Sequence, residues 1–304
     1  MKSAAITALL AACGPTAPPE QPRDITAPTP RKPVTVTCIP STGAKITNAI
    51  GEGKRVRYCL GDTKQCFAID PDVADVGGFA HVEAVPPPPP AGAYVETTQP
   101  KVEVCGSVDC TTLTDKVLGN AAQIRAATTA DGMFAAFLFA ATTTKAYVEV
   151  WDVTTTKKLA TIRPPKGQAC GDVAMLGEVV LLRCGAQASL FSRQGKKLAD
   201  AGGKGFELAS YVPVEGNLWA FLDERGARIA LQDVARGNVL KLIDTSGVFM
   251  IGGARQGTNL GESALVRLAD GRLVVIAGAP ALGSVAAVEP KTGVVELRQA
   301  PLCR

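Results

Sequence analysis

Residues 147–162 read YVEVWDVTTTKKLATI. From Tyr147 to Trp151 every residue except Glu149 is aromatic or β-branched, the composition that is typical of a strand. The polar run Asp152 to Thr156 follows, and a second strand-like segment begins at Lys157. The stretch therefore predicts two antiparallel strands joined by a short turn.

The same pattern recurs along the chain. The segments RVRYC, KVEVC and YVEVW place Cys59, Cys105 and Trp151 at equal spacings of 46 residues. A copy of the hairpin starts at Phe191, and looser copies start at Gln232 and Val288. A strand–turn–strand unit at a period near 45 residues indicates a radially repeated four-stranded sheet. We therefore expect an all-β fold over residues 34–304, a β-propeller of six blades. Seven blades are the alternative, because the last interval of 56 residues could hide further strands around Val248–Ile251.

Strand-like segments also precede most of these hairpins. The run Phe134 to Ala141 is apolar without strict alternation, as expected for a strand that is buried on both faces. The turns Ala130-Asp131-Gly132 and Ala269-Asp270-Gly271 introduce two of these segments, as Asp-Gly pairs often do in hairpins. Because the repeats are irregular, a pair of β-sandwiches is the structural alternative.

Two segments resemble a known repeat family. YVEVWDVTTTKKLATI resembles the final hairpin of a WD40-type repeat, and TTADGMFAAF, residues 128–137, resembles the turn and inner strand that open such a blade. The resemblance spans residues 34–304 but is specific in only one or two repeats. The Gly-His pair of eukaryotic WD40 repeats is missing, and the single histidine, His81, cannot supply it. The chain is closer to divergent bacterial propellers of the YVTN and WD40-like kind.

Composition bounds the class of protein. The chain has 304 residues, 46% of them hydrophobic and 20% charged, which predicts a folded core rather than global disorder. With 31 Gly and 21 Pro, long regular helices are not expected. The net charge is +4 and no block of Lys and Arg stands out in the sequence, so we expect no nucleic-acid partner.

The amino-terminal residues predict where the protein is located in the cell. Residues 1–12 carry Lys2 and a short apolar stretch, as a secretory signal peptide does, and the stretch is too short to span a bilayer. Leu10 to Cys13 resembles the lipobox of bacterial lipoproteins, which implies lipidation of Cys13 and a membrane anchor; a chance Cys in an apolar leader is the alternative. By the same resemblance Gly14 favours the outer membrane of the cell envelope, with the folded domain in the periplasm or at the cell surface. Residues 13–33 hold seven prolines and predict an extended tether of up to about 60 Å.

The remaining cysteines number eight, an even count that suits disulfide bonds in an oxidising compartment. A zinc site is the competing interpretation, but the chain has no CxxC pair and His81 has no cysteine close by in sequence. Within each of three predicted hairpins, two cysteines are equidistant from the turn, and the last two cysteines lie at the ends of the folded region, which a propeller must bring together. The expected pairs are Cys59–Cys66, Cys105–Cys110, Cys170–Cys184 and Cys38–Cys303.

Few residues suggest chemistry. His81 could serve a hydrolase, but no GxSxG motif accompanies it, and a partly buried strand residue is the preferred interpretation. Asp70-Pro71-Asp72 could bind calcium, although a turn explains it better, and Asp223 and Glu224 with Arg225 and Arg228 are expected in a solvated loop. Trp151 and Trp219 are interpreted as core residues, and Pro86 to Pro90 as a stiff exposed loop or a polyproline ligand.

Two classes of function remain open. The first is a non-catalytic scaffold that binds a protein or glycan partner through the propeller loops. The second is an extracytoplasmic enzyme of the lactonase-like or quinoprotein-like kind, since both occur on propellers. One histidine and two tryptophans are too few for the metal ligands of the former or the repeated docking motifs of the latter. We therefore expect no catalytic residues, no metal and no cofactor, and favour the scaffold.

Overall fold

The structure is a computed structural model. It describes residues 34–35, 38–40, 46–61, 65–74, 79–87, 94–98, 101–105, 110–113, 124–139, 145–165, 167–223, 225, 227–251, 254–255, 263–278 and 283–303. The predicted signal peptide, Cys13 and the tether lie outside the described residues, as do Glu224 and Pro88 to Pro90.

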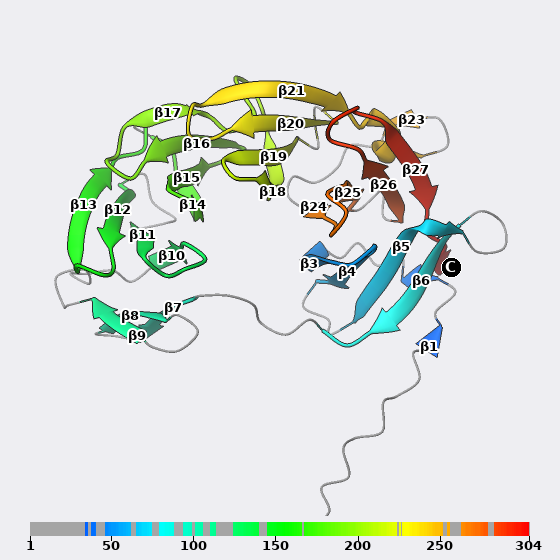
Figure 1. The fold of residues 1–304 in the computed structure, drawn as a ribbon, viewed down its shortest axis with the longest axis horizontal. Coiled ribbons are helices and arrows are strands. Elements are labelled where there is room, and N and C mark those ends of the chain that lie inside the picture. The colour runs from blue at the N-terminus through cyan, green and yellow to red at the C-terminus, as the bar shows by residue number, and fades with distance from the viewer. Residues whose placement is uncertain are drawn as a thin grey trace, which may run out of the picture. The chain divides into compact units, whose positions relative to one another are not determined.

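Four sheets share one plan, in which four consecutive antiparallel strands lie side by side in chain order (Figure 1). The first comprises β10 (Ile124–Thr128), β11 (Phe134–Phe139), β12 (Tyr147–Asp152) and β13 (Lys157–Ile162). The second comprises β14 (Cys170–Leu176), β15 (Val179–Cys184), β16 (Gln187–Ser192) and β17 (Lys197–Asp200). The third comprises β18 (Leu208–Glu215), β19 (Leu218–Asp223), β20 (Arg228–Asp233) and β21 (Asn238–Asp244), and the fourth β24 (Ala264–Arg267), β25 (Leu273–Ile276), β26 (Ser284–Val288) and β27 (Val295–Gln299).

The amino-terminal part follows a similar plan. There β3 (Ile46–Glu52), β4 (Arg55–Leu60), β5 (Cys66–Ala74) and β6 (Ala80–Val85) form a sheet, and β1 (Val34–Thr35) pairs with β6 at its edge. A three-stranded sheet of β7 (Tyr94–Thr98), β8 (Lys101–Cys105) and β9 (Cys110–Leu113) comes next in the chain. Two short pairs complete the described strands, β2 (Ile39–Pro40) with β28 (Leu302–Cys303) and β22 (Met250–Ile251) with β23 (Ala254–Arg255).

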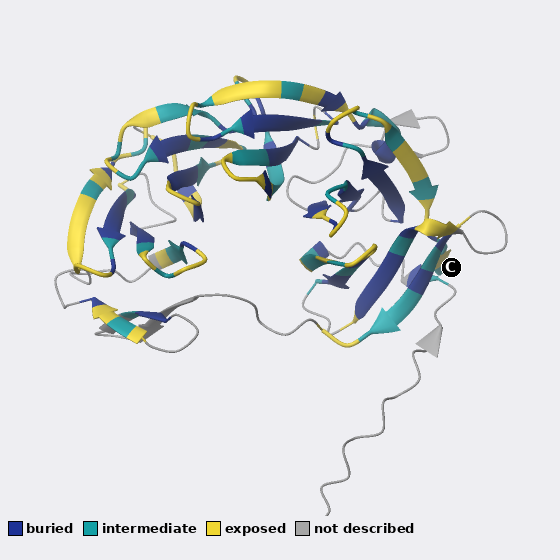
Figure 2. Ribbon diagram, viewed as in Figure 1, coloured by how far each residue is buried: buried dark blue, intermediate teal, exposed yellow. Residues whose placement is uncertain are grey.

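Burial follows strand position within each sheet. The middle strands are buried, and β25 and β26 are buried throughout, as the apolar runs predict. The first strand β10 contacts β14, and the first strand β24 contacts both β18 and β3, whereas the last strands β13, β21 and β27 are mostly exposed (Figure 2). The first strand of each sheet is therefore the inner one and the last is the outer one.

Apolar side chains fill the space between consecutive sheets. Phe137 of β11 packs with Val104 of β8, and Leu138 on the other face of β11 belongs to a cluster with Val173 of β14. Similar clusters join the sheet of β14–β17 to that of β18–β21, the latter to that of β24–β27, and the last sheet to the sheet of β3–β6. Meander sheets that pack face to face in succession are the architecture of a β-propeller.

A glycine in the last turn of three sheets fixes this packing. A side chain at Gly195, before β17, would lie 3.2 Å from Ala160 of β13. One at Gly237, before β21, would lie 2.9 Å from Ala199 of β17, and one at Gly293, before β27, would lie 3.2 Å from Lys241 of β21. All three glycines have positive φ, between 76° and 83°. The turn of each sheet thus lies directly against the outer strand of the sheet before it.

The register of the repeats differs from the sequence prediction. RVRYC and KVEVC are β4 and β8, the second strands of their sheets, but YVEVW is β12, the third strand of its own. The 46-residue spacing from Cys105 to Trp151 therefore joins strands that are not equivalent. The shorter intervals from Trp151 to Phe191 and Gln232 do join equivalent strands, because β12, β16 and β20 all stand third.

The segment around Val248 is not the strand that the sequence predicted. Ser246–Phe249 forms a 3-10 helix, and only Met250 and Ile251 continue as the short strand β22. Val248 and Phe249 are fully buried in the cluster between the sheets of β18–β21 and β24–β27. The 56-residue interval between Gln232 and Val288 thus contributes apolar side chains that fill the space between two sheets. Its described residues build no further four-stranded sheet beyond that of β24–β27.

Candidate interaction surface at the junction of the first and last sheets

A bulge in β5 presents the residues that the sequence placed in a turn. Asp70 pairs with His81 of β6, and Ala74 pairs with Ala80, the very next residue along the partner strand. Three residues of β5 therefore face no counterpart, as in an enlarged β-bulge. Pro71 lacks the N–H that a regular ladder would need. The turn prediction for Asp70-Pro71-Asp72 was wrong because the strand continues beyond the interruption.

The bulge directs Asp72 to the last sheet. Its two carboxylate oxygens accept hydrogen bonds of 2.7 Å from Nη1 and Nη2 of Arg272, in the turn between β24 and β25. Nε of Arg272 also donates to Asp270 over 2.8 Å, so the guanidinium is held on two sides. Bidentate pairs of this kind fix geometry as well as adding attraction. The hydrogen bond with Arg272 lowers the pKa of Asp72, and the same bond raises the pKa of Arg272.

Apolar side chains are exposed at the same hairpin. Val73, directly after Asp72, is 46% exposed, and Phe79, directly before β6, is 42% exposed. Arginine and aromatic side chains are enriched at the centres of protein interfaces, and charged residues surround them. We call Asp72, Val73, Phe79 and Arg272 the bulge surface.

The sheets of β3–β6 and β24–β27, which the Asp72–Arg272 pair joins, have further connections. A disulfide links Cys38, before β3–β6 in the chain, to Cys303, after β24–β27, with a Cα–Cα distance of 4.9 Å. Beside it, the parallel strands β2 and β28 pair, and the amide of Ile39 donates to the carbonyl of Pro301. Ile39 also belongs to the apolar cluster shared by the two sheets. The two sheets that carry the bulge surface are therefore connected by a covalent bond, by backbone pairing and by apolar packing.

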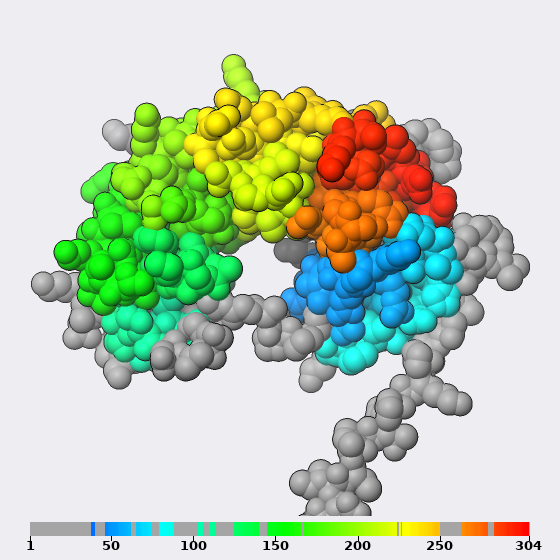
Figure 3. All heavy atoms as spheres, in the orientation of Figure 1, coloured from blue at the N-terminus to red at the C-terminus, as the bar shows by residue number. Residues whose placement is uncertain are grey.

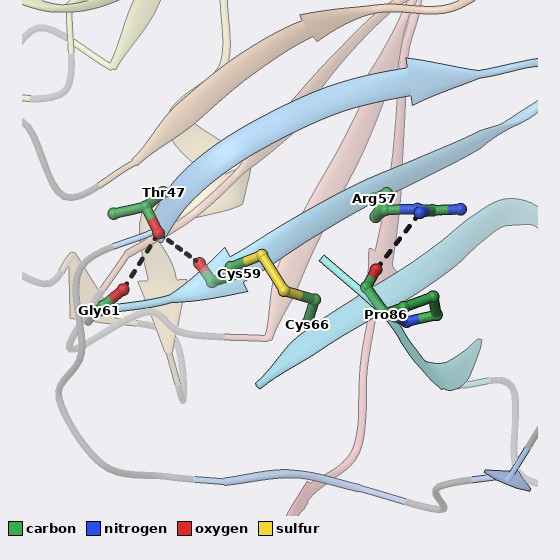
Figure 4. The surroundings of a disulfide bond; sticks show 6 residues. All are labelled: Thr47, Arg57, Cys59, Gly61, Cys66 and Pro86. Atoms are coloured by element: carbon green, nitrogen blue, oxygen red, sulfur yellow. Dashed lines mark hydrogen bonds between the residues drawn. A yellow bond between two sulfur atoms is a disulfide. The ribbon is translucent and has the colours of Figure 1, made fainter. Parts of the chain in front are cut away.

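The other disulfides lie within hairpins. They join Cys59 to Cys66, Cys105 to Cys110 and Cys170 to Cys184, so all four pairs are those expected from the sequence. Each of these three pairs stands directly opposite in strand register. Figure 4 shows the first, flanked by Thr47, whose hydroxyl donates to the carbonyls of Cys59 and Gly61.

His81 takes part in an ordinary surface network. Its Nε2 lies 3.1 Å from Oε1 of Glu83, and the second oxygen of Glu83 accepts from Arg55 over 2.9 Å. The contact with His81, followed by the charge of Arg55, lowers the pKa of Glu83. The histidine is a half-buried strand residue, as the sequence indicated. No group of three His, Cys, Asp or Glu able to hold a metal occurs among the described residues.

Asp223 departs from its predicted environment. It ends β19, is 1% exposed, and its carboxylate lies 3.0 Å from Nε of Arg228 at the start of β20. The guanidinium of Arg228 also lies over the ring of Phe206, 5.3 Å from its centroid. The expected solvated loop thus starts with a buried carboxylate that is paired with a partly exposed guanidinium, whereas Arg225 is exposed, as expected. Its sequence signal was the apolar run that leads directly into Asp223.

Both tryptophans pack against apolar residues, as expected. Trp151 is buried, and its indole N–H donates to Oε2 of the buried Glu149 over 3.1 Å. Lys158 of β13 binds the other oxygen of Glu149 at 3.0 Å, so the buried charge is compensated. Trp219 is partly buried beside Tyr211, with ring centroids 6.2 Å apart. Of the proline run, the carbonyl of Pro86 accepts from Arg57 (Figure 4).

No helix among the described residues is both long and apolar enough to cross a bilayer.

A comparison with known protein families and another with curated proteins found no match. A comparison with solved structures found the WD40 β-propeller domain of Doa1, with 10% identity, a TM-score of 0.44, and coverage of 88% of this chain and 86% of that one. It also found a chain of the mitotic checkpoint complex, with 12% identity, a TM-score of 0.40, and coverage of 97% and 75%. The structural neighbours of this all-β chain thus include a WD40 propeller domain.

Proposed function

We propose that the protein is a non-catalytic scaffold that binds a partner protein through the bulge surface. In this proposal the folded domain is a six-bladed propeller, held at the bacterial outer membrane by a lipid on Cys13. The observation that carries this proposal is the exposure of Val73 and Phe79 next to the bidentate pair of Asp72 and Arg272. A held guanidinium beside two exposed apolar side chains offers both orientation and apolar contact to a partner.

A protein suits this surface better than a glycan does. Val73 offers only apolar contact, and the polar groups of Asp72 and Arg272 are already bonded to each other. A sugar would need free donors and acceptors for its hydroxyl groups, because unsatisfied polar groups are costly to bury. Apolar side chains of a partner protein would instead gain from covering Val73 and Phe79.

The experiment that tests this site is quantitative affinity capture from detergent-solubilised membranes. The test variant carries Val73→Ser with Phe79→Ser, and the control carries Met133→Ser, an apolar residue 43% exposed in a different sheet. We expect the test variant to lose a bound protein that both the wild type and the control retain. Equal capture by all three proteins would contradict the proposed site.

The cellular address is tested separately. Four disulfides support an oxidising compartment such as the periplasm. Lipidation at Cys13 would anchor the chain through several acyl chains, which together give stable membrane binding. Cys13→Ser should abolish signal cleavage and move the protein out of the lipid-anchored fraction. Unchanged processing and fractionation of this variant would contradict the anchor while leaving the bulge surface untouched.

A further inference from the structure

The outer strands of three consecutive sheets carry most of the excess positive charge. Residues 157–163, 196–204 and 236–244 comprise β13, β17 and β21 with their adjoining turns, and we call them the basic rim. They contain eight Lys or Arg and two acids, Asp200 and Asp244. Their net charge is +6, whereas that of the whole chain is +4, so the rest of the protein is acidic on balance.

The fold makes these segments neighbours although about 40 residues separate each from the next. The turn at Gly195 lies against Ala160 of β13, and the turn at Gly237 lies against Leu198 and Ala199 of β17. In Figures 1 and 2 the three strands follow one another along the outside of the domain, and in Figure 3 the sheets that carry them, coloured green to yellow, pack against one another without a gap. The cations therefore share one extended surface.

Many of these cations are available to a ligand. Lys157, Arg163, Lys196 and Lys204 are exposed and make no ion pair with the described residues. Lys197 is paired with Asp200 at 2.7 Å, which neutralises one of the two acids of the rim. The rim thus presents unscreened positive charge to any large anion that approaches.

Aliphatic side chains stand among the cations. Leu159 of β13 is 40% exposed, and Leu240 and Leu242 of β21 are 65% and 54% exposed. Single exposed apolar residues are common, but Leu240 and Leu242 lie on one strand with only Lys241 between them, and neighbouring exposed apolar groups are typical of contact sites. Cations that bind phosphates, together with leucines that can enter an apolar layer, are the combination that interfacial membrane segments use.

We propose that the basic rim binds the surface of a bilayer that contains anionic phospholipids. The lysine ammonium groups would contact the headgroup phosphates, and Leu240 and Leu242 would enter the boundary between headgroups and acyl chains. An acidic protein would account for the lysines, but the two exposed leucines on the outermost strand favour a lipid surface. The proposal rests only on described residues and does not depend on the bulge surface or on lipidation of Cys13.

The test uses the full chain with Cys13→Ser, so that no acyl chain contributes to binding. The protein is sedimented with phosphatidylcholine vesicles that contain or lack phosphatidylglycerol, at low and at high salt. We expect binding only to the anionic vesicles and weaker binding at high salt, because salt screens exposed charges. Equal binding to both kinds of vesicle, or to neither, would overturn the proposal.

Matched charge variants then locate the surface. Lys157→Gln with Lys196→Gln removes two rim cations, and Lys54→Gln with Lys145→Gln removes two exposed cations elsewhere. At about fivefold for each lysine near an anionic surface, the rim pair should weaken vesicle binding by roughly 25-fold, and the control pair should change it little. Equal weakening by both pairs would mean that the site is not the rim.

A last arm separates lipid from protein. Leu240→Ser with Leu242→Ser should reduce vesicle binding while leaving the salt dependence in place, because only the apolar contribution is lost. Retention on immobilised polyglutamate without vesicle binding would overturn the membrane proposal in favour of an acidic protein partner. The unfolding midpoint of each variant should match that of the parent, since every changed side chain is exposed.

Discussion

The disulfide between Cys38 and Cys303 should contribute more stability than any other in the chain. The decisive comparison is the double variant Cys38→Ala with Cys303→Ala against Cys59→Ala with Cys66→Ala. The first bond joins residues 265 positions apart, whereas the second joins residues 7 apart. A disulfide that closes a longer loop restricts the unfolded chain more. Removal of that bond therefore raises the conformational entropy of the unfolded chain more than removal of a bond across a short loop.

The loop lengths set the size of the difference. Loop-closure entropy gives about 5.6 kcal/mol for the long loop and about 2.3 kcal/mol for the short one at 25 °C. Cys59 and Cys66 are buried, so their replacement also loses packing worth about 1 kcal/mol. The net difference is about 2 kcal/mol, which in a domain of this length corresponds to roughly 4 °C in the unfolding midpoint.

The assay is thermal unfolding by circular dichroism, with peptide mapping under non-reducing conditions to establish the bonds in each variant. Hydrogen exchange should also show that β2, β28 and the sheet of β3–β6 exchange first once the closing bond is absent, because only non-covalent contacts then hold the ends. A lower midpoint for the Cys59 and Cys66 variant, or a peptide that joins Cys38 to a cysteine other than Cys303, would refute the reasoning.

Gln232→Leu should destabilise the domain by about 3 kcal/mol in urea unfolding, because the buried amide side chain forms hydrogen bonds with three backbone groups of two sheets. The control Gln187→Leu, at an exposed position, should change the free energy of unfolding by less than about 0.5 kcal/mol. Gly237→Ala should lower the thermal midpoint more than Gly216→Ala. Both glycines have positive φ, but only a side chain at Gly237 would meet the backbone of the preceding sheet, so equal shifts would contradict the close packing. The pKa of Asp72 is lower in the folded state than in the unfolded state, where it is near 4. The ionised carboxylate therefore stabilises the folded protein at pH values above the unfolded pKa, and this contribution is lost as the pH falls through the folded pKa. It is below about 1 kcal/mol, because the ion pair is partly exposed. The midpoint difference between wild type and Asp72→Asn should therefore be constant near neutral pH and vanish in acid, and a difference that grows in acid would contradict the ion pair.

Short-range features of this chain were accessible from its sequence. Cysteines placed symmetrically about a turn must face each other across a hairpin, and the continuous apolar run of β11 had to be buried on both faces. Both inferences depend only on residues within a few positions of each other. The buried strands and hairpin bonds could therefore be predicted.

Features that depend on several segments were missed. Proline at position 71 signalled an interruption, but nothing local distinguishes a bulge from a turn when the strand resumes only at Ala74. The partner of Asp72 lies 200 residues away, so the bulge surface had no sequence signal. The basic rim did have a sequence signal, the Lys-Lys-Leu that occurs at residues 157–159 and again at 196–198. That the two copies share one surface is evident only from the fold, in which β13 and β17 are neighbours.

The closing bond also imposes an order on maturation. Three disulfides close over 5, 7 and 14 residues, and each can form as soon as the two strands of its own hairpin have been synthesised and have paired. Cys38 precedes these six cysteines in the chain, but its own partner follows 265 positions later. During this time Cys59 and Cys66 are the nearest competitors, so rapid pairing of these two protects Cys38 from a wrong bond. The small hairpin disulfide thus keeps the nearest thiols from reacting with Cys38, and a chain truncated before residue 303 lacks the partner of Cys38.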